Sequence, residues 1–279
     1  MEEKRNFDLL TLGQVLLRLS PPNNDRLVRG DTFVKQVGGA ELNVAVGVAL
    51  LGLRTGVISK LPSHDMGSFM KGKIRSYGVS DDFFMYDDSP SARVGIYYYE
   101  NGAYPRKPKV IYDRANSSFY SLKIDEIPEK AYTASRCFHT SGITLALSPK
   151  VRETTIEMIK RFKAAGTLVS FDVNFRGNLW TGEEAKECIE QILPYVDIFF
   201  CSEDTARLTF KKTGTAREMM KSFTEEYPIS IVASTQRIVH SPKSHTFGSI
   251  IYDARKDIYY EEEPYRDIDV VDRIGSGDA

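Results

Sequence analysis

The chain closes on Asp272-Arg273-Ile274-Gly275-Ser276-Gly277-Asp278-Ala279. The two glycines leave room for backbone N–H groups to converge on an anion, because no Cβ blocks a close approach. A carboxylate beside such a nest would repel a bound phosphate. It suits a group that takes a proton from a hydroxyl while that hydroxyl attacks a phosphoryl group. The motif therefore predicts Asp278 as a general base beside an anion hole of Gly275, Ser276 and Gly277; the alternative is a Gly/Ser turn that leads into a helix.

A second glycine motif, Gly38-Gly39-Ala40-Glu41-Leu42-Asn43, lies near the start of the chain. It opens an amphipathic pattern over residues 41–51, which predicts a helix that ends at Gly52. One interpretation is a loop whose backbone approaches a polar ligand, with the amide of Asn43 offered to a hydroxyl. A tight turn before an ordinary helix explains the same pattern, because short glycine motifs are common.

A third polar segment, Asp172-Val173-Asn174-Phe175-Arg176, follows a predicted buried strand. Its three polar side chains alternate along the chain and are expected to converge at one mouth of the sheet. The guanidinium of Arg176 is always charged and can form paired hydrogen bonds, so it suits a phosphate or a carboxylate. The alternative is a helix-capping loop with a surface arginine.

The order of predicted elements is typical of an α/β fold. From residue 136 strands alternate with helices: strands 137–140, 167–172, 197–201, 229–234, 249–252 and 258–260, and helices 149–165, 183–193, 203 onward and 216–227. This alternation predicts a mostly parallel central sheet with helices on both faces. Ligands bind at the carboxyl ends of strands in such sheets, and both Asp172 and the terminal glycine loop fall at strand ends.

Two regions predict a small separate β-sheet. Residues 83–86, 93–100 and 108–112 are rich in aromatic and β-branched residues and are separated by turn clusters. Short strands are also expected at 15–19 and 32–37. Tyrosines on such a sheet are suited to its own core or to covering a ligand.

Composition excludes several classes of function. The formal net charge of −1 gives no global field that would recruit nucleic acid or an anionic membrane. The apolar run 44–53 is too short to cross a bilayer, and the N-terminus lacks a signal-peptide core. Three cysteines without CxxC spacing predict buried thiols in a reducing compartment. A cytoplasmic protein is the resulting expectation.

The two glycine motifs, at 38–43 and 272–278, resemble the two signatures of the ribokinase-like (PfkB) carbohydrate kinases. The resemblance extends over the whole length of the chain. The resemblance implies one kinase domain over 1–279, with lid strands within about 14–37 and 83–112. It also implies a small β lid over the sugar, and ATP with Mg²⁺ as cofactors, a monovalent cation being a further candidate. Relatives continue beyond the aspartate of the terminal motif, so the chain is expected to be incomplete at its C-terminus.

Within that family the chain is most similar to 2-keto-3-deoxygluconate kinases. Tyr97, Tyr112 and Arg114 resemble the lid residues that bind the keto-acid, and Asp172-x-Asn174-x-Arg176 resembles a segment shared between substrate and nucleotide. The implied activity is ATP-dependent phosphorylation of the C6 hydroxyl of 2-keto-3-deoxygluconate. The implied substrate-binding residues are Gly38, Gly39, Asn43, Tyr97, Tyr112, Arg114, Arg176 and Asp278. Residues implied to contact ATP are Gly275, Ser276, Gly277, Asn174, Arg176, Gln236 and Arg237; no residue is implied as a metal ligand.

Departures from the family pattern bear on the substrate. Arg18 stands where related sugar kinases carry an aspartate, and with Arg114 and Arg176 it favours an anionic substrate. Arg273 replaces a usual threonine, and Gln14 a common glutamate. The alternatives are a kinase for a neutral sugar such as fructose or ribose, or for a nucleoside, and a non-catalytic ligand-binding protein. Aromatic edges on the lid predict a homodimer.

Overall fold

The structure, a computed structural model, describes residues 5–278. Its main sheet consists of β1 (Phe7–Leu12), β4 (Thr55–Pro62), β5 (Val79–Ser80), β6 (Phe84–Asp87), β9 (Ser135–Ser141), β10 (Leu168–Asp172), β11 (Ile198–Phe200), β12 (Ile231–Ser241), β13 (Ser244–Asp253), β14 (Ile258–Glu261) and β15 (Tyr265–Asp269). Their order is β14-β13-β12-β11-β10-β9-β1-β4-β5, with β15 beside β13 and β6 beside β4. In this order every neighbouring pair from β12 through β11, β10, β9, β1 and β4 to β5 is parallel. The pairs of β13 with β12, β14 and β15 are antiparallel. The predicted, mostly parallel α/β sheet is confirmed.

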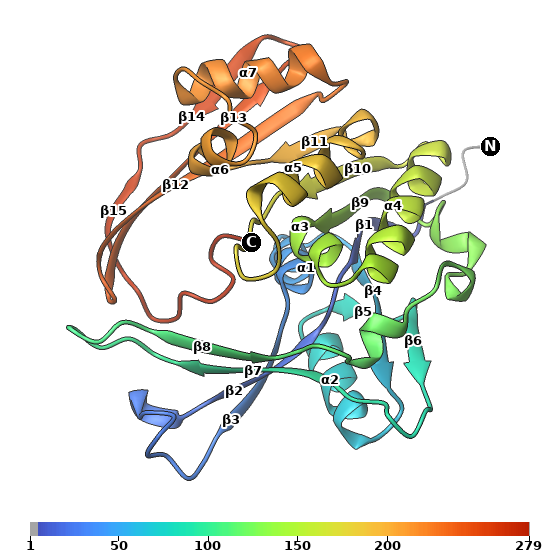
Figure 1. The fold of residues 1–279 in the computed structure, drawn as a ribbon, viewed down its shortest axis with the longest axis vertical. Coiled ribbons are helices and arrows are strands. Elements are labelled where there is room, and N and C mark those ends of the chain that lie inside the picture. Colours follow the sequence, from blue (N-terminus) through green and yellow to red (C-terminus); the bar gives the residue numbers. More distant parts are fainter. Residues whose placement is uncertain (1–4, 279) are drawn as a thin grey trace.

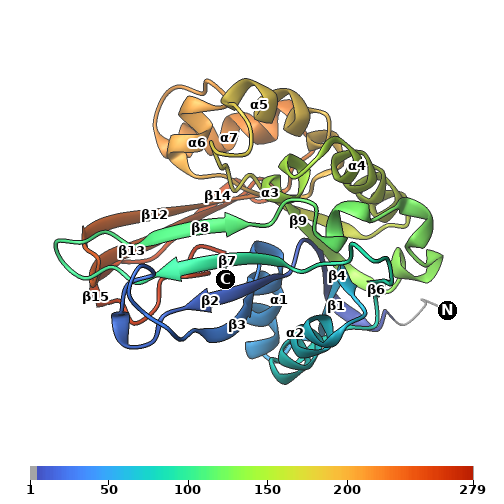
Figure 2. The same ribbon diagram turned by 60° about the horizontal axis from the view of Figure 1, so that its bottom comes forward.

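Helices cover both faces of this sheet. They are α1 (Ala40–Leu50), α2 (Asp65–Ser76), α3 (Gly142–Ala146), α4 (Pro149–Ala164), α5 (Gly182–Glu190), α6 (Glu203–Leu208) and α7 (Ala216–Glu226), with short 3-10 turns at Pro22–Asn24, Ser118–Ser121, Ile124–Glu126, Glu129–Ala131 and Leu193–Tyr195. Figure 2 shows α1 and α2 on one side and α4 to α7 on the other. Thr181 and Thr215 cap α5 and α7 through their hydroxyls, which satisfies backbone N–H groups at each helix start. Within residues 5–278, no helix combines the length and the apolar character that a membrane crossing needs.

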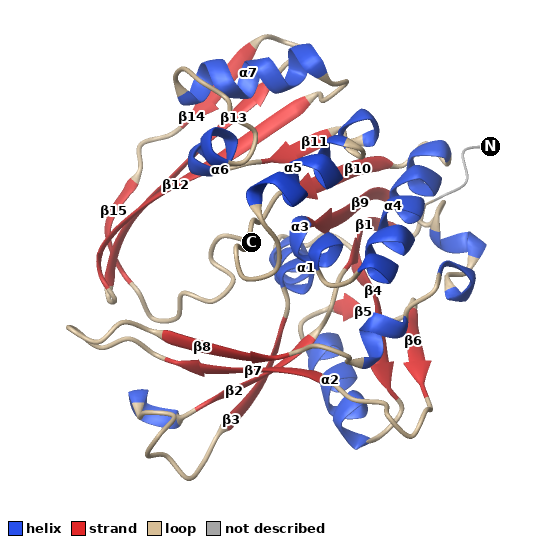
Figure 3. Cartoon of the chain, viewed as in Figure 1, coloured by secondary structure: helices blue, strands red, loops and turns tan. Residues whose placement is uncertain are grey.

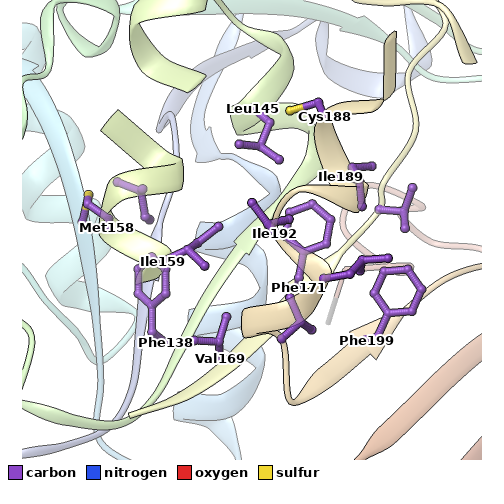
Figure 4. Packing of buried hydrophobic residues seen from close by; sticks show 14 of the residues in the cluster. Phe138, Leu145, Met158, Ile159, Val169, Phe171, Cys188, Ile189, Ile192 and Phe199 are labelled. Carbon is purple, nitrogen blue, oxygen red and sulfur yellow. The ribbon is translucent and has the colours of Figure 1, made fainter. Parts of the chain in front are cut away.

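The core has two large clusters, because strand side chains alternate between faces, and a third small one of Leu16, Tyr97 and Tyr99 on the smaller sheet. On β4, Val57 packs under α1 and α2, whereas its neighbour Ile58 belongs to the larger cluster on the opposite face. In that larger cluster the rings of Phe138 and Phe162 stack at 4.0 Å between centroids. Figure 4 shows Cys188 among its apolar residues. Cys188 and Cys201 are buried free thiols, as predicted, whereas Cys137 is a free thiol that is only partly buried.

A second, smaller sheet stands apart from the main one (Figure 3). It contains β2 (Leu16–Ser20), β3 (Val34–Gly38), β7 (Gly95–Glu100) and β8 (Lys109–Asp113), in the order β3-β2-β7-β8. Strands β2 and β7 pair in parallel, and the two outer pairs are antiparallel. In Figure 1 the loop that leads to Asp278 lies between this sheet and the long β12–β13 hairpin.

Several features differ from the sequence-based expectation, and α3 and β5 are among the elements that were not predicted. The segment predicted at 83–86 forms a strand, but this strand, β6, pairs in parallel with β4 in the main sheet and is not a lid strand. Its aromatic composition favours a strand without indicating which sheet receives it. The hairpin of β12 and β13 extends seven residues beyond the predicted end at 234, to Ser241. Strand β15 was not predicted.

Two glycines of α2 provide a matched test of this packing. A Cβ on Gly67 would lie 1.9 Å from the carbonyl oxygen of Pro62, whereas a Cβ on Gly72 would meet no atom within 4 Å. We expect Gly67→Ala to lower the free energy of unfolding by about 1–3 kcal/mol through overpacking. Gly72→Ala should raise it by about 0.5–1 kcal/mol, because alanine loses less backbone entropy. Urea unfolding of both variants measures the difference; equal shifts would contradict the close approach of α2 to Pro62.

Candidate active site

Two adjoining cavities lie between the small sheet and the carboxyl ends of the main strands. The lid cavity, of about 140 Å³, is lined by Leu16, Gly39, Ala40, Glu41, Asn43, Tyr97, Val110, Tyr112, Arg114, Ile143, Arg176, Asn178, Leu179, Ile274, Gly275 and Asp278. The strand-end cleft, of about 680 Å³, is lined by Tyr99, Pro108, Val110, Tyr112, Asp172, Asn174, Phe175, Arg176, Phe200, Cys201, Ser202, Asp204, Thr205, Ala233, Thr235, Arg237, Phe247, Arg273, Ile274, Gly275, Gly277 and Asp278. Asp278 and Gly275 line both, so the terminal motif lies where the two cavities meet.

Two side-chain amides hold the carboxylate of Asp278. Asn43 Nδ2, on α1, donates to Asp278 Oδ2 at 2.8 Å, and Asn174 Nδ2, after β10, donates to Asp278 Oδ1 at 3.1 Å. Each oxygen thereby keeps further lone pairs for another donor. The carboxylate is fixed in orientation and remains able to accept a proton from a ligand hydroxyl.

Backbone geometry explains why the two partners reach Asp278. Asn174 adopts a left-handed conformation with φ 37°, which asparagine tolerates, and its N–H donates to Asp172 Oδ1 at 2.9 Å. On the other side, Gly275 has φ 79°, and a Cβ there would lie 2.9 Å from Asn43 Nδ2. Glycine is therefore required at 275 for the terminal loop to pack against α1.

The glycine pair before α1 also lets neighbouring atoms of the protein come close to the backbone. A Cβ on Gly38 would lie 2.7 Å from the hydroxyl oxygen of Tyr97, and one on Gly39 would lie 2.6 Å from the carbonyl oxygen of Gln14. Gly39 also lines the lid cavity, whereas Gly38 does not. Gly38 thus makes room for the tyrosine and is set back from the cavity wall.

Arg114 is the cation that the small sheet presents to the lid cavity. Its Nε donates to Gln14 Oε1 at 2.7 Å, while Gln14 Nε2 donates to Ser117 Oγ at 2.6 Å, so the side chain is anchored from behind. The guanidinium lies 5.5 Å from the ring centre of Tyr112. Among residues 5–278 Arg114 forms no ion pair with its neighbour Asp113, which pairs with Arg93 at 2.7 Å. The remaining N–H groups of Arg114 are available to an anion.

Glu41 forms a buried polar part of the same cavity. Its Oε1 accepts hydrogen bonds from Ser141 Oγ at 2.6 Å and from Thr144 Oγ1 at 2.7 Å. Burial raises the pKa of Glu41 above its usual value, although the two hydroxyl hydrogen bonds act in the opposite direction. The rise favours a neutral carboxyl group facing the cavity, which reduces repulsion between Glu41 and Asp278.

Arg18 does not contribute to either cavity, and the expectation that it favours an anionic substrate is wrong. Its NH1 forms an ion pair with Asp272 Oδ2 at 2.7 Å, and its Nε donates to Ser20. The guanidinium also lies 4.7 Å from the ring centre of Tyr99. The charge of Arg18 is thus neutralised within the protein, where it fixes the first residue of the terminal motif.

The residues expected at a nucleotide divide into two groups. Asn174, Gly275, Gly277, Arg176 and Arg237 line the strand-end cleft. Gln236 and Ser276 do not. Alternation along β12 turns Gln236 to the opposite face from Arg237.

Ser276 is exposed within the terminal loop, and its hydroxyl donates to the Arg273 carbonyl at 3.0 Å. Its amide donates weakly to the same carbonyl, at 3.4 Å. The backbone N–H groups of Gly275 and Gly277 make no hydrogen bond with any of residues 5–278. Those two amides are the candidates for an anion hole.

Sequence reasoning gave no site role to several residues that line the cavities, among them Glu41, Arg273 and Ile274. Glu41 was placed at the start of the amphipathic helix that follows the glycine pair. Arg273 and Ile274 were read as spacers of the terminal motif. The signal for Glu41 was its place between the glycine pair and Asn43, but sequence alone does not reveal its burial or its two hydroxyl partners.

Asp172 gives the site a testable dependence on pH. Burial raises its pKa from 3.8 to about 7, and the charge of Asp278 adds to the rise, against the N–H of Asn174, which lowers it. The folded protein therefore holds a proton that the unfolded chain releases near pH 4, so this residue's contribution to stability falls as pH rises from about 4 to about 7.

Asp172→Asn removes that dependence and keeps an acceptor for the Asn174 N–H. The melting temperature of the variant, relative to the wild type, should rise steadily from pH 4 to pH 7 and then level off. A difference that stays constant over this range would contradict the raised pKa.

Comparison with known proteins gives consistent results. Residues 6–279 match the pfkB family carbohydrate kinase. A 2-dehydro-3-deoxygalactonokinase of Haloferax volcanii is 34% identical over 272 residues, which cover 98% of this chain and 81% of that protein. A crystal structure of 2-dehydro-3-deoxygluconokinase from Thermotoga maritima is similar with a TM-score of 0.91 and 31% identity, covering 98% of this chain and 84% of that one. A 5-dehydro-2-deoxygluconokinase of Listeria monocytogenes is 26% identical over 278 residues, 99% of this chain and 82% of that protein.

Proposed function

Because the chain belongs to the PfkB family of carbohydrate kinases, we propose that it transfers the γ-phosphate of ATP to the C6 hydroxyl of 2-keto-3-deoxygluconate, with Asp278 as general base. Two of the relatives are named 2-dehydro-3-deoxygalactonokinase and 2-dehydro-3-deoxygluconokinase. Those names differ in the configuration of one carbon of the sugar acid. The proposal therefore includes the galactonate epimer as a substrate to be tested.

The position of Asp278 carries the proposal. It lines the lid cavity and the strand-end cleft at their junction, where an acceptor hydroxyl in one would meet a phosphate in the other. A general base must lie within hydrogen-bonding reach of the proton that it removes. The amides of Asn43 and Asn174 hold the carboxylate at this junction without supplying a cation that would weaken it as a base.

The lid cavity fits a small sugar acid. Arg114, anchored by Gln14, supplies a guanidinium that can bind a carboxylate through two hydrogen bonds. The half-exposed ring of Tyr112 and the buried ring of Tyr97 lie 6.0 Å apart between centroids and form an apolar wall. The carboxyl group of Glu41 also lines this cavity and can accept hydrogen bonds from sugar hydroxyls. We infer that the carboxylate binds at Arg114 and the terminal hydroxyl points toward Asp278.

The strand-end cleft fits the polyphosphate donor. The free amides of Gly275 and Gly277 are suited to stabilise the charge that develops on the transferred phosphoryl group. No cluster of three or more His, Cys, Asp or Glu residues within 5–278 could hold a metal ion by itself. Mg²⁺ bound to nucleotides is held largely by phosphates and water with one or two carboxylates, and Asp172 is a carboxylate of the cleft that could face it. Such an ion would neutralise charge on the phosphates.

Turnover with a substrate panel tests the proposal. The full-length protein with MgATP is given 2-keto-3-deoxygluconate, its galactonate epimer, fructose, ribose and a nucleoside, and kcat/KM is measured for each. We expect the two keto-acids to exceed the neutral acceptors, with the product phosphorylated at C6 by NMR. Preference for a neutral sugar or nucleoside would replace the substrate assignment, and absence of turnover with every acceptor would favour a ligand-binding protein.

A further inference from the structure

Three arginines from separate parts of the chain line the strand-end cleft. Arg176 follows β10, Arg237 lies on β12, and Arg273 belongs to the terminal motif. None of the three forms an ion pair with an acid among residues 5–278. Arg18, by contrast, pairs with Asp272, the residue that precedes Arg273. The only hydrogen bond from Arg176 within those residues goes to the Phe175 carbonyl, at 3.0 Å.

These charges act on one another. The pKa of Arg237 is lowered first by burial and then by the positive charges of Arg273 and Arg176. Arginine remains protonated in proteins, so the three guanidiniums repel each other across the cleft. A ligand with several negative charges would remove that repulsion and satisfy the N–H groups, which a single carboxylate in the lid cavity cannot do.

The three arginines differ in which cavity they face. Arg176 lines both cavities, but Arg237 and Arg273 line only the strand-end cleft. On β12 the small side chains of Ala233 and Thr235 share the face of Arg237 and leave space above the strand. Arg237 and Arg273 are therefore placed to contact the donor and not the acceptor.

We propose that Arg237 and Arg273 form a pair that binds the polyphosphate tail of the donor nucleotide. This inference rests on the proposed kinase function. It adds Arg273 as a donor-binding residue, and pairs it with Arg237, which the family resemblance already implied as an ATP contact. Each guanidinium can bind phosphate oxygens through two N–H groups. Because the pair recognises phosphate charge, inorganic tripolyphosphate should bind the same cleft and compete with ATP.

The test measures binding without turnover. Calorimetric titration of the full-length protein with tripolyphosphate, in the absence of any acceptor, is compared for the wild type, Arg237→Gln, Arg273→Thr and the double variant. Each single change should weaken tripolyphosphate binding about tenfold or more, as expected for a lost charge-assisted hydrogen bond. Arg273→Lys should recover part of the loss, since it restores the charge without the planar fork. Arg266→Gln, an exposed arginine of β15 outside both cavities, is the matched control and should bind as the wild type does.

The outcomes separate this inference from the proposed function. Weaker tripolyphosphate and ATP binding with unchanged keto-acid binding would support the arginine pair, even if no acceptor were phosphorylated. Unchanged tripolyphosphate affinity in the folded double variant would overturn it, even if the wild type were an active kinase. Equal loss of keto-acid binding would also overturn it, because the pair would then act on both cavities.

Discussion

Asp278→Asn should lower kcat by about 10²- to 10⁴-fold, the usual contribution of a positioned general base. The asparagine cannot take the proton from the acceptor hydroxyl, although it nearly preserves the size of the side chain. It also presents an NH₂ group to one of the two amides that now donate to the carboxylate, Asn43 and Asn174. Steady-state kinetics with 2-keto-3-deoxygluconate and MgATP measure the loss. The KM for each substrate should change far less than kcat.

An exposed aspartate supplies the control for this prediction. Asp269→Asn, at the end of β15, removes a carboxylate that lines neither cavity and should leave kcat unchanged. Calorimetry with the keto-acid should still detect binding to Asp278→Asn, which separates a lost base from a collapsed site. Turnover near the wild-type rate in Asp278→Asn would remove this residue from the catalytic role.

The sequence was informative where chain topology forces residues together. The polar segment after β10 and the terminal motif were both expected at strand ends, and Asn174 does contact Asp278, 104 residues away along the chain. The glycine pair was expected to let the backbone approach a ligand, and it places Asn43 against Asp278. These predictions rest on periodicity, turn chemistry and the rule for parallel sheets, which depend on local sequence.

The sequence was less informative where a side chain has a choice of partners. Arg18 was expected to serve the substrate, but Asp272 neutralises it, and the pairing spans 254 residues. Gln236 and Arg237 were both assigned to the nucleotide through the family resemblance, beyond the predicted strand end at 234. The structure places them on β12, where they lie on opposite faces. The strand at 83–86 was assigned to the lid because composition does not encode which edge a strand joins. Partner choice depends on tertiary packing, which pattern rules do not contain.

Arg114→Ala should raise the KM for 2-keto-3-deoxygluconate by about tenfold to a hundredfold, the range expected when a hydrogen-bonded charge loses its partner. Arg114 lines the lid cavity, and Gln14 occupies only its Nε, so the terminal N–H groups remain for a carboxylate. The matched ligand is 3-deoxyfructose, the neutral sugar with a hydroxymethyl group in place of the carboxylate. Its affinity, measured as KM or as an inhibition constant, should change much less. The ratio of the two effects therefore reports carboxylate recognition.

Two further variants separate charge from packing in this prediction. Arg114→Ala also leaves Gln14 Oε1 without its donor and removes the contact with Tyr112, so some loss through the small sheet is expected for any acceptor. Arg93→Ala removes an arginine that pairs with Asp113, beside Arg114 but outside both cavities, and should leave both acceptors unaffected. Arg114→Lys keeps the charge without the planar fork and should recover part of the keto-acid affinity. Equal losses for the keto-acid and for 3-deoxyfructose in Arg114→Ala would show that Arg114 supports the lid and does not bind the carboxylate.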